Sequence, residues 1–222
     1  MTARQVCYQL VSRQVIVNNR SPFQAMSNDP IETRKDGMIP WEWIEDRLRR
    51  PRAVTKWVDL VDFADTVRRA YQSDVWAIQK HLVKVWLEKD ALSGIFDDVL
   101  RHYGVTLNVG CGYNGSGSIH SAAVRYQKWG GQVTILYYED FDPSCEDMVR
   151  FLRVRLGELY TMPEIMKCAL TKGDKGLSLA PDFPKATDTW QEVFMASWGE
   201  VAVDLETLPI DVLQKRLEWE LG

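Results

Sequence analysis

The chain has 222 residues, of which 45% are apolar and 26% are charged, as in an ordinary globular protein with one large domain or two small ones. No apolar run is long enough to cross a bilayer and residues 1–5 lead into no apolar leader, so we expect neither a membrane span nor a signal peptide. The four cysteines form no CxxC pair, which predicts reduced thiols in a cytoplasmic protein and excludes a disulfide framework or a CxxC zinc site.

The net charge of −4 argues weakly against a nucleic-acid-binding protein, but the charge is unevenly distributed. Residues 1–80 contain 13 Lys/Arg and 10 Asp/Glu, which gives +3. Residues 81–222 contain the other 14 and 21, which gives −7. One interpretation is that the first part contacts phosphates while the second concentrates carboxylates, but a charge of +3 over 80 residues is also unremarkable, and charge alone favours that second interpretation.

The first 80 residues read as helical segments. Apolar spacing predicts helices over 2–14 and 23–36, and a long amphipathic helix over 55–80. Between them, residues 42–50 carry three arginines near their end, and Pro51-Arg52 ends the segment. Short helices, a turn and a basic segment fit a winged-helix-like module that binds DNA. Its candidate phosphate contacts are Arg47, Arg49 and Arg50.

From residue 81 onward, apolar runs typical of buried strands alternate with helical segments. We expect strands over 83–88, 105–109 and 133–138. The expected helices span 90–102, 118–128, 145–159 and 209–221, with an extended loop over 171–190. This alternation predicts an α/β domain, with a Rossmann-like parallel sheet covered by helices on both faces.

Acidic residues follow two of these three strands. Glu88 comes directly after the first strand, and Asp140 and Asp142 follow the third. Sites in open α/β sheets form beyond the carboxyl ends of the strands. Like charges this close together are costly unless a cation neutralises them, and Mg²⁺ prefers oxygen ligands. The sequence therefore predicts a magnesium site that acts on phosphodiesters; the alternative is that these acids cap helices or are solvated.

These residues resemble a known family. The segments Val85–Asp90, Gly112–Tyr113 and Asp140–Ser144 are similar to the Toprim domain of the A subunit of topoisomerase VI and of the related meiotic double-strand-break protein. The similarity is highest to short, stand-alone versions from bacteria and phages. The resemblance implies Mg²⁺ bound by Glu88, Asp140 and Asp142. It also implies a winged-helix-like DNA-cleaving domain at 1–55, a connecting helix at 56–80 and a Toprim domain at 81–222.

The resemblance extends to the N-terminus. Residues 2–8, Thr-Ala-Arg-Gln-Val-Cys-Tyr, match the family's cleavage motif except at Cys7, where the family has an aromatic residue. By this match Tyr8 is the nucleophile that attacks DNA, and Arg4 and Glu88 assist it. The resemblance further implies double-stranded DNA as substrate and a homodimer in which Tyr8 reaches the partner's metal site. A separate GHKL-type ATPase subunit would act with it.

Other readings of the same residues remain open. Lys89 is a candidate contact for the DNA phosphate or a solvated lysine. Cys145 replaces a glycine of the family motif and its side chain would crowd the turn beside the metal, which together with Cys7 favours a DNA-binding protein that no longer cleaves. A Toprim nuclease that uses water is a further alternative. A phosphatase with Asp140 as nucleophile is disfavoured, because it leaves Glu88 without a role.

Overall fold

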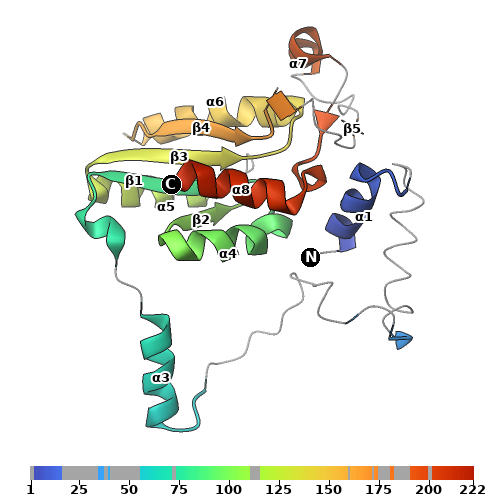
Figure 1. The fold of residues 1–222 in the computed structure, drawn as a ribbon. Helices are drawn as coiled ribbons and strands as arrows, with labels where there is room; N and C mark the ends of the chain where they lie inside the picture. The colour runs from blue at the N-terminus through green and yellow to red at the C-terminus, as the bar shows by residue number, and fades with distance from the viewer. Residues whose placement is uncertain are drawn as a thin grey trace.

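The computed structural model describes residues 3–16, 35–37, 40, 56–71, 74–110, 116–159, 161–171, 173–174, 181–182, 191–199 and 202–222. The chain is a mixed α/β protein built on a four-stranded parallel sheet of order β2-β1-β3-β4 (Figure 1). The strands are β1 (His81–Leu87), β2 (Thr106–Val109), β3 (Gln132–Tyr138) and β4 (Glu164–Ala169). The expected parallel sheet is thus confirmed. The fourth strand was not foreseen.

Helices cover both faces of the sheet, as the alternation of apolar runs predicts (Figure 1). One face carries α4 (Ser93–Tyr103) and α8 (Ile210–Leu221), and the other carries α5 (Ser116–Trp129) and α6 (Pro143–Glu158). The left-handed backbone of Gly104 (φ 62°) ends α4, a conformation that glycine adopts without the steric cost of a Cβ.

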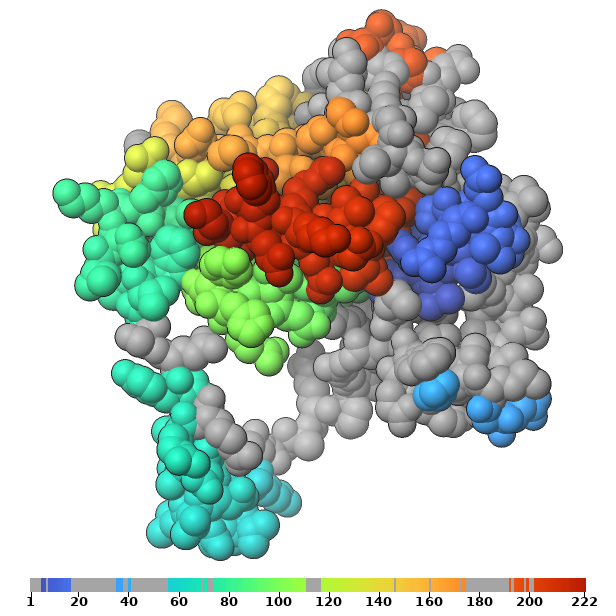
Figure 2. Space-filling model, viewed as in Figure 1, coloured from blue at the N-terminus to red at the C-terminus, as the bar shows by residue number. Residues whose placement is uncertain are grey.

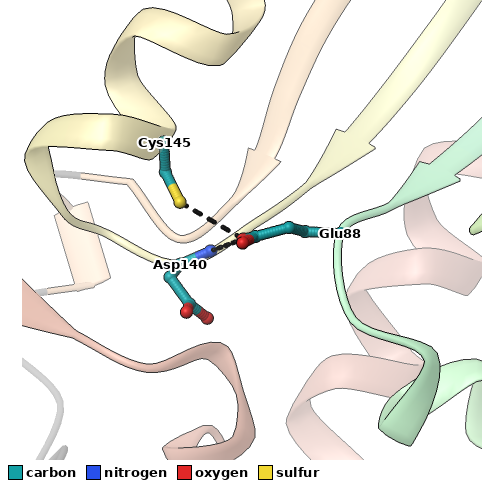
Figure 3. Close-up of side chains that lie close together, drawn as sticks. All are labelled: Glu88, Asp140 and Cys145. Carbon is teal, nitrogen blue, oxygen red and sulfur yellow. Dashed lines mark hydrogen bonds between the residues drawn. The ribbon is translucent and has the colours of Figure 1, made fainter. Parts of the chain in front are cut away.

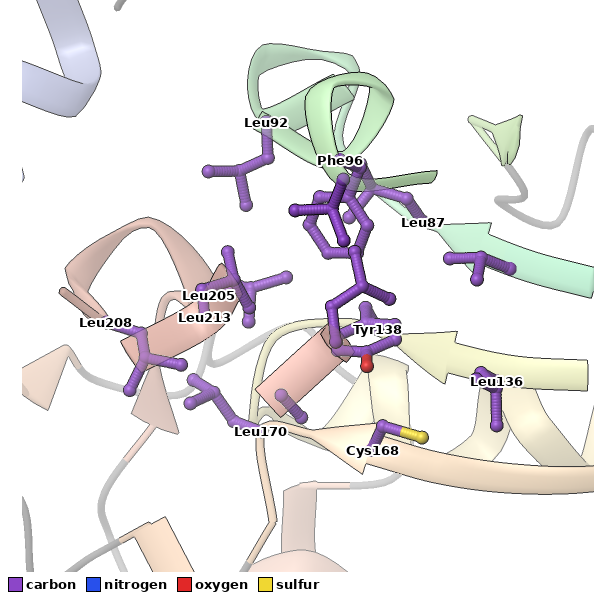
Figure 4. Close-up of a cluster of buried hydrophobic side chains, with 14 of the residues drawn as sticks. Leu87, Leu92, Phe96, Leu136, Tyr138, Cys168, Leu170, Leu205, Leu208 and Leu213 are labelled. Carbon is purple, nitrogen blue, oxygen red and sulfur yellow. The ribbon is translucent and has the colours of Figure 1, made fainter. Parts of the chain in front are cut away.

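Two apolar clusters fill the space between the sheet and the helices. One lies under α4 and α8, and Figure 4 shows Leu87, Phe96 and Tyr138 at its centre. The other lies under α5 and α6, and includes Trp86 and Tyr137. Both faces of the central strands are therefore buried, which explains why the strands appear in the sequence as continuous apolar runs. Each fully buried large side chain contributes about 1.5–3 kcal/mol to folding.

The sheet order places the ends of β1 and β3 side by side. These strands are direct neighbours, and Leu87 lies opposite Tyr138 at their last paired position. The pairing continues one step further, because the Glu88 amide donates to the Tyr138 carbonyl at 3.0 Å. The residues that follow the two strands therefore leave the sheet at the same rim.

The C-terminal part of the chain reaches this rim through a second, two-stranded sheet. Its strands are β5 (Pro181–Asp182) and β6 (Ala202–Val203), which pair antiparallel. An antiparallel bridge joins Val203 to Phe141, which lies three residues after the end of β3. Helix α7 (Gln191–Trp198) precedes β6, and the 3₁₀ turn η5 (Leu205–Thr207) follows it.

The N-terminal region is described only in part. Helix α1 (Ala3–Ser12) confirms the first expected helix. The expected helix over 55–80 is shorter than predicted: α3 (Leu60–Ala70) is followed by the separate 3₁₀ turn η2 (Val75–Ile78). Most of the segment expected to form the winged-helix-like module, including residues 41–55, lies outside the described residues. In the part of the chain that the structure describes, no helix is long and apolar enough to cross a membrane.

Helix α3 stands apart from the sheet and its covering helices (Figure 1, Figure 2). Asp59 caps its N-terminus by accepting from the amides of Val61 and Asp62, both at 2.9 Å. Its apolar side chains do not contribute to either core cluster, and several are exposed, among them Leu60, Val61 and Val67. The amphipathic pattern therefore forms the helix without burying it.

Candidate metal site

Three groups able to bind a metal ion meet where β1 and β3 end (Figure 3). The donor atoms of Glu88, Asp140 and Cys145 all lie within 4.8 Å of one another. One oxygen of Glu88, Oε2, accepts from the Asp140 amide at 3.4 Å and from the Cys145 thiol at 3.2 Å. The structure thus brings together two of the three carboxylates that the sequence predicts, and adds a thiol.

Asp140 is almost fully buried, with 9% of its surface exposed. Its Oδ1 accepts from the Leu205 amide at 2.8 Å, and its Oδ2 lies 2.5 Å from the ammonium of Lys89. Burial raises the pKa of Asp140 to about 7, with further increases from the charges of Asp204 and Glu88; Lys89 and the Leu205 amide act in the opposite direction. A raised pKa means that the charged carboxylate is destabilised by burial. A bound cation would offset this, because it stabilises the charged form of the carboxylate.

A third carboxylate, Asp204, joins the site from the C-terminal part of the chain. Its Oδ2 lies 2.5 Å from the ammonium of Lys89, so this lysine lies between Asp140 and Asp204. Burial lowers the pKa of Lys89, but the two carboxylates outweigh it and raise the pKa above its ordinary value. We refer to Glu88, Asp140 and Asp204 as the acidic rim. Asp204 was not among the predicted site residues, because the apolar run before it, residues 201–203, is too short to predict a strand.

Cys145 is buried in the first turn of α6, with 3% of its surface exposed. Burial raises the pKa of its thiol well above the ordinary value, and the charge of Glu88 adds to this effect. The side chain therefore stays a neutral thiol at pH 7 and donates to Glu88. Cys145 holds the Glu88 carboxylate in place rather than offering a thiolate to a metal ion, and hard cations such as Mg²⁺ prefer oxygen over sulfur.

Asp142 is not part of the group formed by Glu88, Asp140 and Cys145. It is the N-cap residue of α6, and its Oδ1 accepts from the Cys145 amide at 2.7 Å. Pro143 follows in the first turn, where its missing N–H costs no helical hydrogen bond. Helix capping is the alternative that the sequence allows for these acids, and the structure shows it for Asp142. Its role as a metal ligand stays a prediction, and the capping contact weighs against it.

Tyr8 lies on α1, which lies beyond the carboxyl ends of the strands, at the edge of the sheet where the acidic rim is found (Figure 1). Gln5 Nε2 donates to the Ala91 carbonyl at 3.0 Å, and Gln9 Nε2 donates to the carbonyls of Glu206 and Leu208 at 3.2 and 3.0 Å. These contacts tie α1 to the segments that follow Lys89 and Asp204 in its own chain. Tyr8 is 7% exposed, which makes it a core residue of this interface.

The remaining candidate residues are not placed by the structure. Arg47, Arg49 and Arg50 lie outside the described residues, and so does the side chain of Arg4. The glycine-rich turn of residues 111–115 also lies outside them. The site as described consists of the acidic rim, Lys89 and Cys145.

This arrangement is suited to binding a cation. The carboxylates of Asp140 and Asp204 both contact the Lys89 ammonium, and a backbone amide orients each of them: the Leu205 amide for Asp140 and the Glu206 amide for Asp204. The oxygen donors fit a hard divalent ion, and the neutral thiol does not compete with them.

Comparisons with protein-family models, with curated proteins and with solved structures found no match.

Proposed function

We propose that this protein is a Mg²⁺-dependent protein that binds and cleaves double-stranded DNA. The observation that carries the proposal is the convergence of Glu88 and Asp140 at the ends of two adjacent parallel strands, with donor atoms within 4.8 Å. Glu88 and Asp140 would hold the cation, which supplies positive charge against a phosphate and its developing negative charge. Both residues lie at the carboxyl edge of an open parallel sheet, which is where functional sites of α/β proteins form.

DNA as the substrate rests on the resemblance to the topoisomerase VI A subunit and the meiotic double-strand-break protein. In that reading the chain has a winged-helix-like N-terminal domain and a Toprim domain, and it acts as a homodimer with a separate ATPase subunit. Tyr8 would attack the phosphodiester, form a phosphotyrosyl bond and release a DNA hydroxyl. Lys89 lies beside Asp140, where its charge can meet a phosphate.

A second candidate function is hydrolysis of DNA by water. The burial of Tyr8, of which 7% is exposed, favours it, because a nucleophile must reach the scissile phosphate. Here a water molecule would attack phosphorus, one P–O bond would break, and the DNA hydroxyl would leave with a proton. The acidic rim would serve both reactions.

The test is incubation of the full chain with supercoiled plasmid and Mg²⁺, followed by denaturation and a search for protein joined to DNA ends. We expect Asp140→Asn to reduce cleavage by about 100-fold or more, because it removes a charge that holds the cation. The matched control is Asp211→Asn, an exposed acid on α8. Tyr8→Phe should abolish the covalent product, whereas Tyr103→Phe, on α4, should not.

The outcomes separate the candidate functions. A covalent product that Tyr8→Phe and Asp140→Asn both abolish supports transesterification. Nicking that survives Tyr8→Phe but needs Asp140 supports hydrolysis. Retained DNA binding without cleavage identifies a DNA-binding protein that does not cleave. DNA binding and cleavage that are both absent, or that do not depend on Mg²⁺ and Asp140, would contradict the proposal.

A further inference from the structure

The place between Asp140 and Asp204 is already filled by a cation, the ammonium of Lys89. Its Nζ lies 2.5 Å from Oδ2 of each carboxylate. All three side chains are largely buried, with exposed fractions of 21% for Lys89, 12% for Asp140 and 10% for Asp204. The two Oδ2 atoms therefore converge on one point, which is occupied by positive charge that the chain itself supplies.

The backbone holds both carboxylates in this orientation. Oδ1 of Asp140 accepts from the Leu205 amide at 2.8 Å, and Oδ1 of Asp204 accepts from the Glu206 amide at 3.0 Å. Each aspartate thus uses one oxygen to fix its position and turns the other toward Lys89. Two oriented carboxylate oxygens are a preformed pair of ligands, held by backbone amides as well as by the lysine.

The oxygen chemistry of this place suits Mg²⁺ better than the cluster that contains Cys145. In Figure 3 the carboxylate of Asp140 points away from Cys145, while its donor oxygen stays within 4.8 Å of that of Glu88. The thiol is neutral and soft, whereas Mg²⁺ takes oxygen ligands and keeps several waters. Asp204 offers Mg²⁺ a carboxylate oxygen as ligand, whereas Cys145 offers only sulfur.

We propose that the divalent cation binds between Asp140 and Asp204 in place of the Lys89 ammonium, and that the released lysine turns to a phosphate oxygen of the substrate. This inference rests on the proposed function, and it adds Asp204 as a ligand and Lys89 as an internal competitor. One cation replaces another, so the two buried carboxylates stay neutralised throughout. The substrate phosphate holds the lysine away from the carboxylates, so cation and substrate strengthen each other's binding.

The first test follows Lys89 itself, in the wild-type chain. Acetylation by an amine-reactive ester, measured per residue by mass spectrometry, reports how accessible and how basic each lysine is. We expect Mg²⁺ to raise the acetylation rate of Lys89 several-fold and in a saturable way. Lys84 is the matched control, because it lies on β1 and donates to Thr106 Oγ1 at 2.9 Å, away from the acidic rim. Protection of Lys89 that persists at saturating Mg²⁺ would overturn the proposal.

The second test measures Mg²⁺ affinity by titration calorimetry. Lys89→Gln should raise the affinity about tenfold, since it removes a positive charge from a partly buried site. In that background, Asp204→Asn should lower the affinity about tenfold, and Asp211→Asn should leave it unchanged. An Asp204→Asn effect no larger than that of Asp211→Asn would remove Asp204 from the ligand set and overturn the proposal.

The two tests also separate this proposal from the proposed function. If the wild type binds no Mg²⁺, or binds it with an affinity that Glu88→Gln and Asp140→Asn do not change, the metal site is wrong and this proposal falls with it. If Mg²⁺ binding needs Asp140 while Lys89 stays protected and Asp204→Asn has no effect, the metal site stands and only the exchange with Lys89 is refuted.

Discussion

At the scale of single residues, two aspartates two positions apart have different surroundings. Asp140 is buried and turns toward Lys89 and Asp204, whereas Asp142 caps α6. Alternation along an extended chain would place both side chains on one side. The chain instead begins a helix at Pro143, so Asp142 meets the free amides of the first helical turn.

This difference predicts the effect of Asp142→Ala. We expect it to lower the free energy of unfolding by about 1 kcal/mol, the usual cost of losing an N-cap, and to leave Mg²⁺ affinity unchanged. Asp59→Ala, which removes the cap of α3 far from the acidic rim, is the control for a lost cap alone. Chemical denaturation and calorimetry give the two quantities. A large loss of Mg²⁺ affinity would instead show that Asp142 leaves the helix end to bind the cation.

At the scale of secondary-structure elements, α1 is attached to the rest of the molecule by glutamine hydrogen bonds as well as by the buried side chains of Tyr8 and Val11. Gln9 satisfies two carbonyls, those of Glu206 and Leu208, and Gln5 satisfies that of Ala91. Both glutamines are buried, so these hydrogen bonds form away from competing water. They position the helix that carries Tyr8, and they fix the turn that carries Asp204.

We therefore expect Gln9→Ala to loosen α1 without unfolding the sheet. Leaving two buried carbonyls without a donor costs about 1–3 kcal/mol each in a rigid site, and detachment of α1 would relieve that cost. Hydrogen exchange should become faster in α1 and at residues 205–208, while β1 and β3 stay protected. Arg13→Ala, an exposed position after the same helix, should change neither. Uniformly faster exchange throughout the sheet would speak against local docking.

At the scale of the whole molecule, a partly buried ion pair joins the last helix to the segment after β4. Arg216 donates to both oxygens of Asp174, at 3.0 and 2.6 Å, and also to the Cys168 carbonyl at 3.1 Å. Burial raises the pKa of Asp174, but the hydrogen bonds from Arg216 and Thr171 outweigh it, and the pKa lies below its ordinary value of 3.8. The charged form of Asp174 is thus favoured in the folded state.

The pH dependence follows from this direction. A carboxyl group whose pKa is lowered by folding stabilises the fold at pH values above its pKa in the unfolded chain, which is 3.8. This stabilisation is lost as the pH falls through the lower pKa of the folded state. We expect Arg216→Gln to reduce the free energy of unfolding by about 1.5–3 kcal/mol at neutral pH, and the difference from wild type to shrink below pH 3.8. Urea denaturation at several pH values measures both. Lys215→Gln, on the exposed side of α8, is the control; a difference that does not vary with pH would rule out this mechanism.

The sequence by itself determined the α/β core and two members of the acidic rim. The apolar runs that end at Leu87 and Tyr138 predict buried parallel strands, and the carboxyl ends of such strands share one edge, where Glu88 and Asp140 meet. It did not reveal β4, because Glu164–Ala169 mixes polar and apolar residues. The family, the substrate and the role of Tyr8 stay predictions.

Only the tertiary structure decided the contacts between distant segments. Asp204 reaches the rim because Val203 pairs with Phe141, and no local pattern encodes a bridge between residues so far apart. The place of Lys89 between two aspartates follows from the same bridge. Local periodicity reports which side chains one element buries, whereas ion pairs across elements depend on how the elements pack. For this reason the sequence predicts the carboxylates of Glu88 and Asp140 at the site, but it does not predict the ion pairs of Lys89 with Asp140 and Asp204.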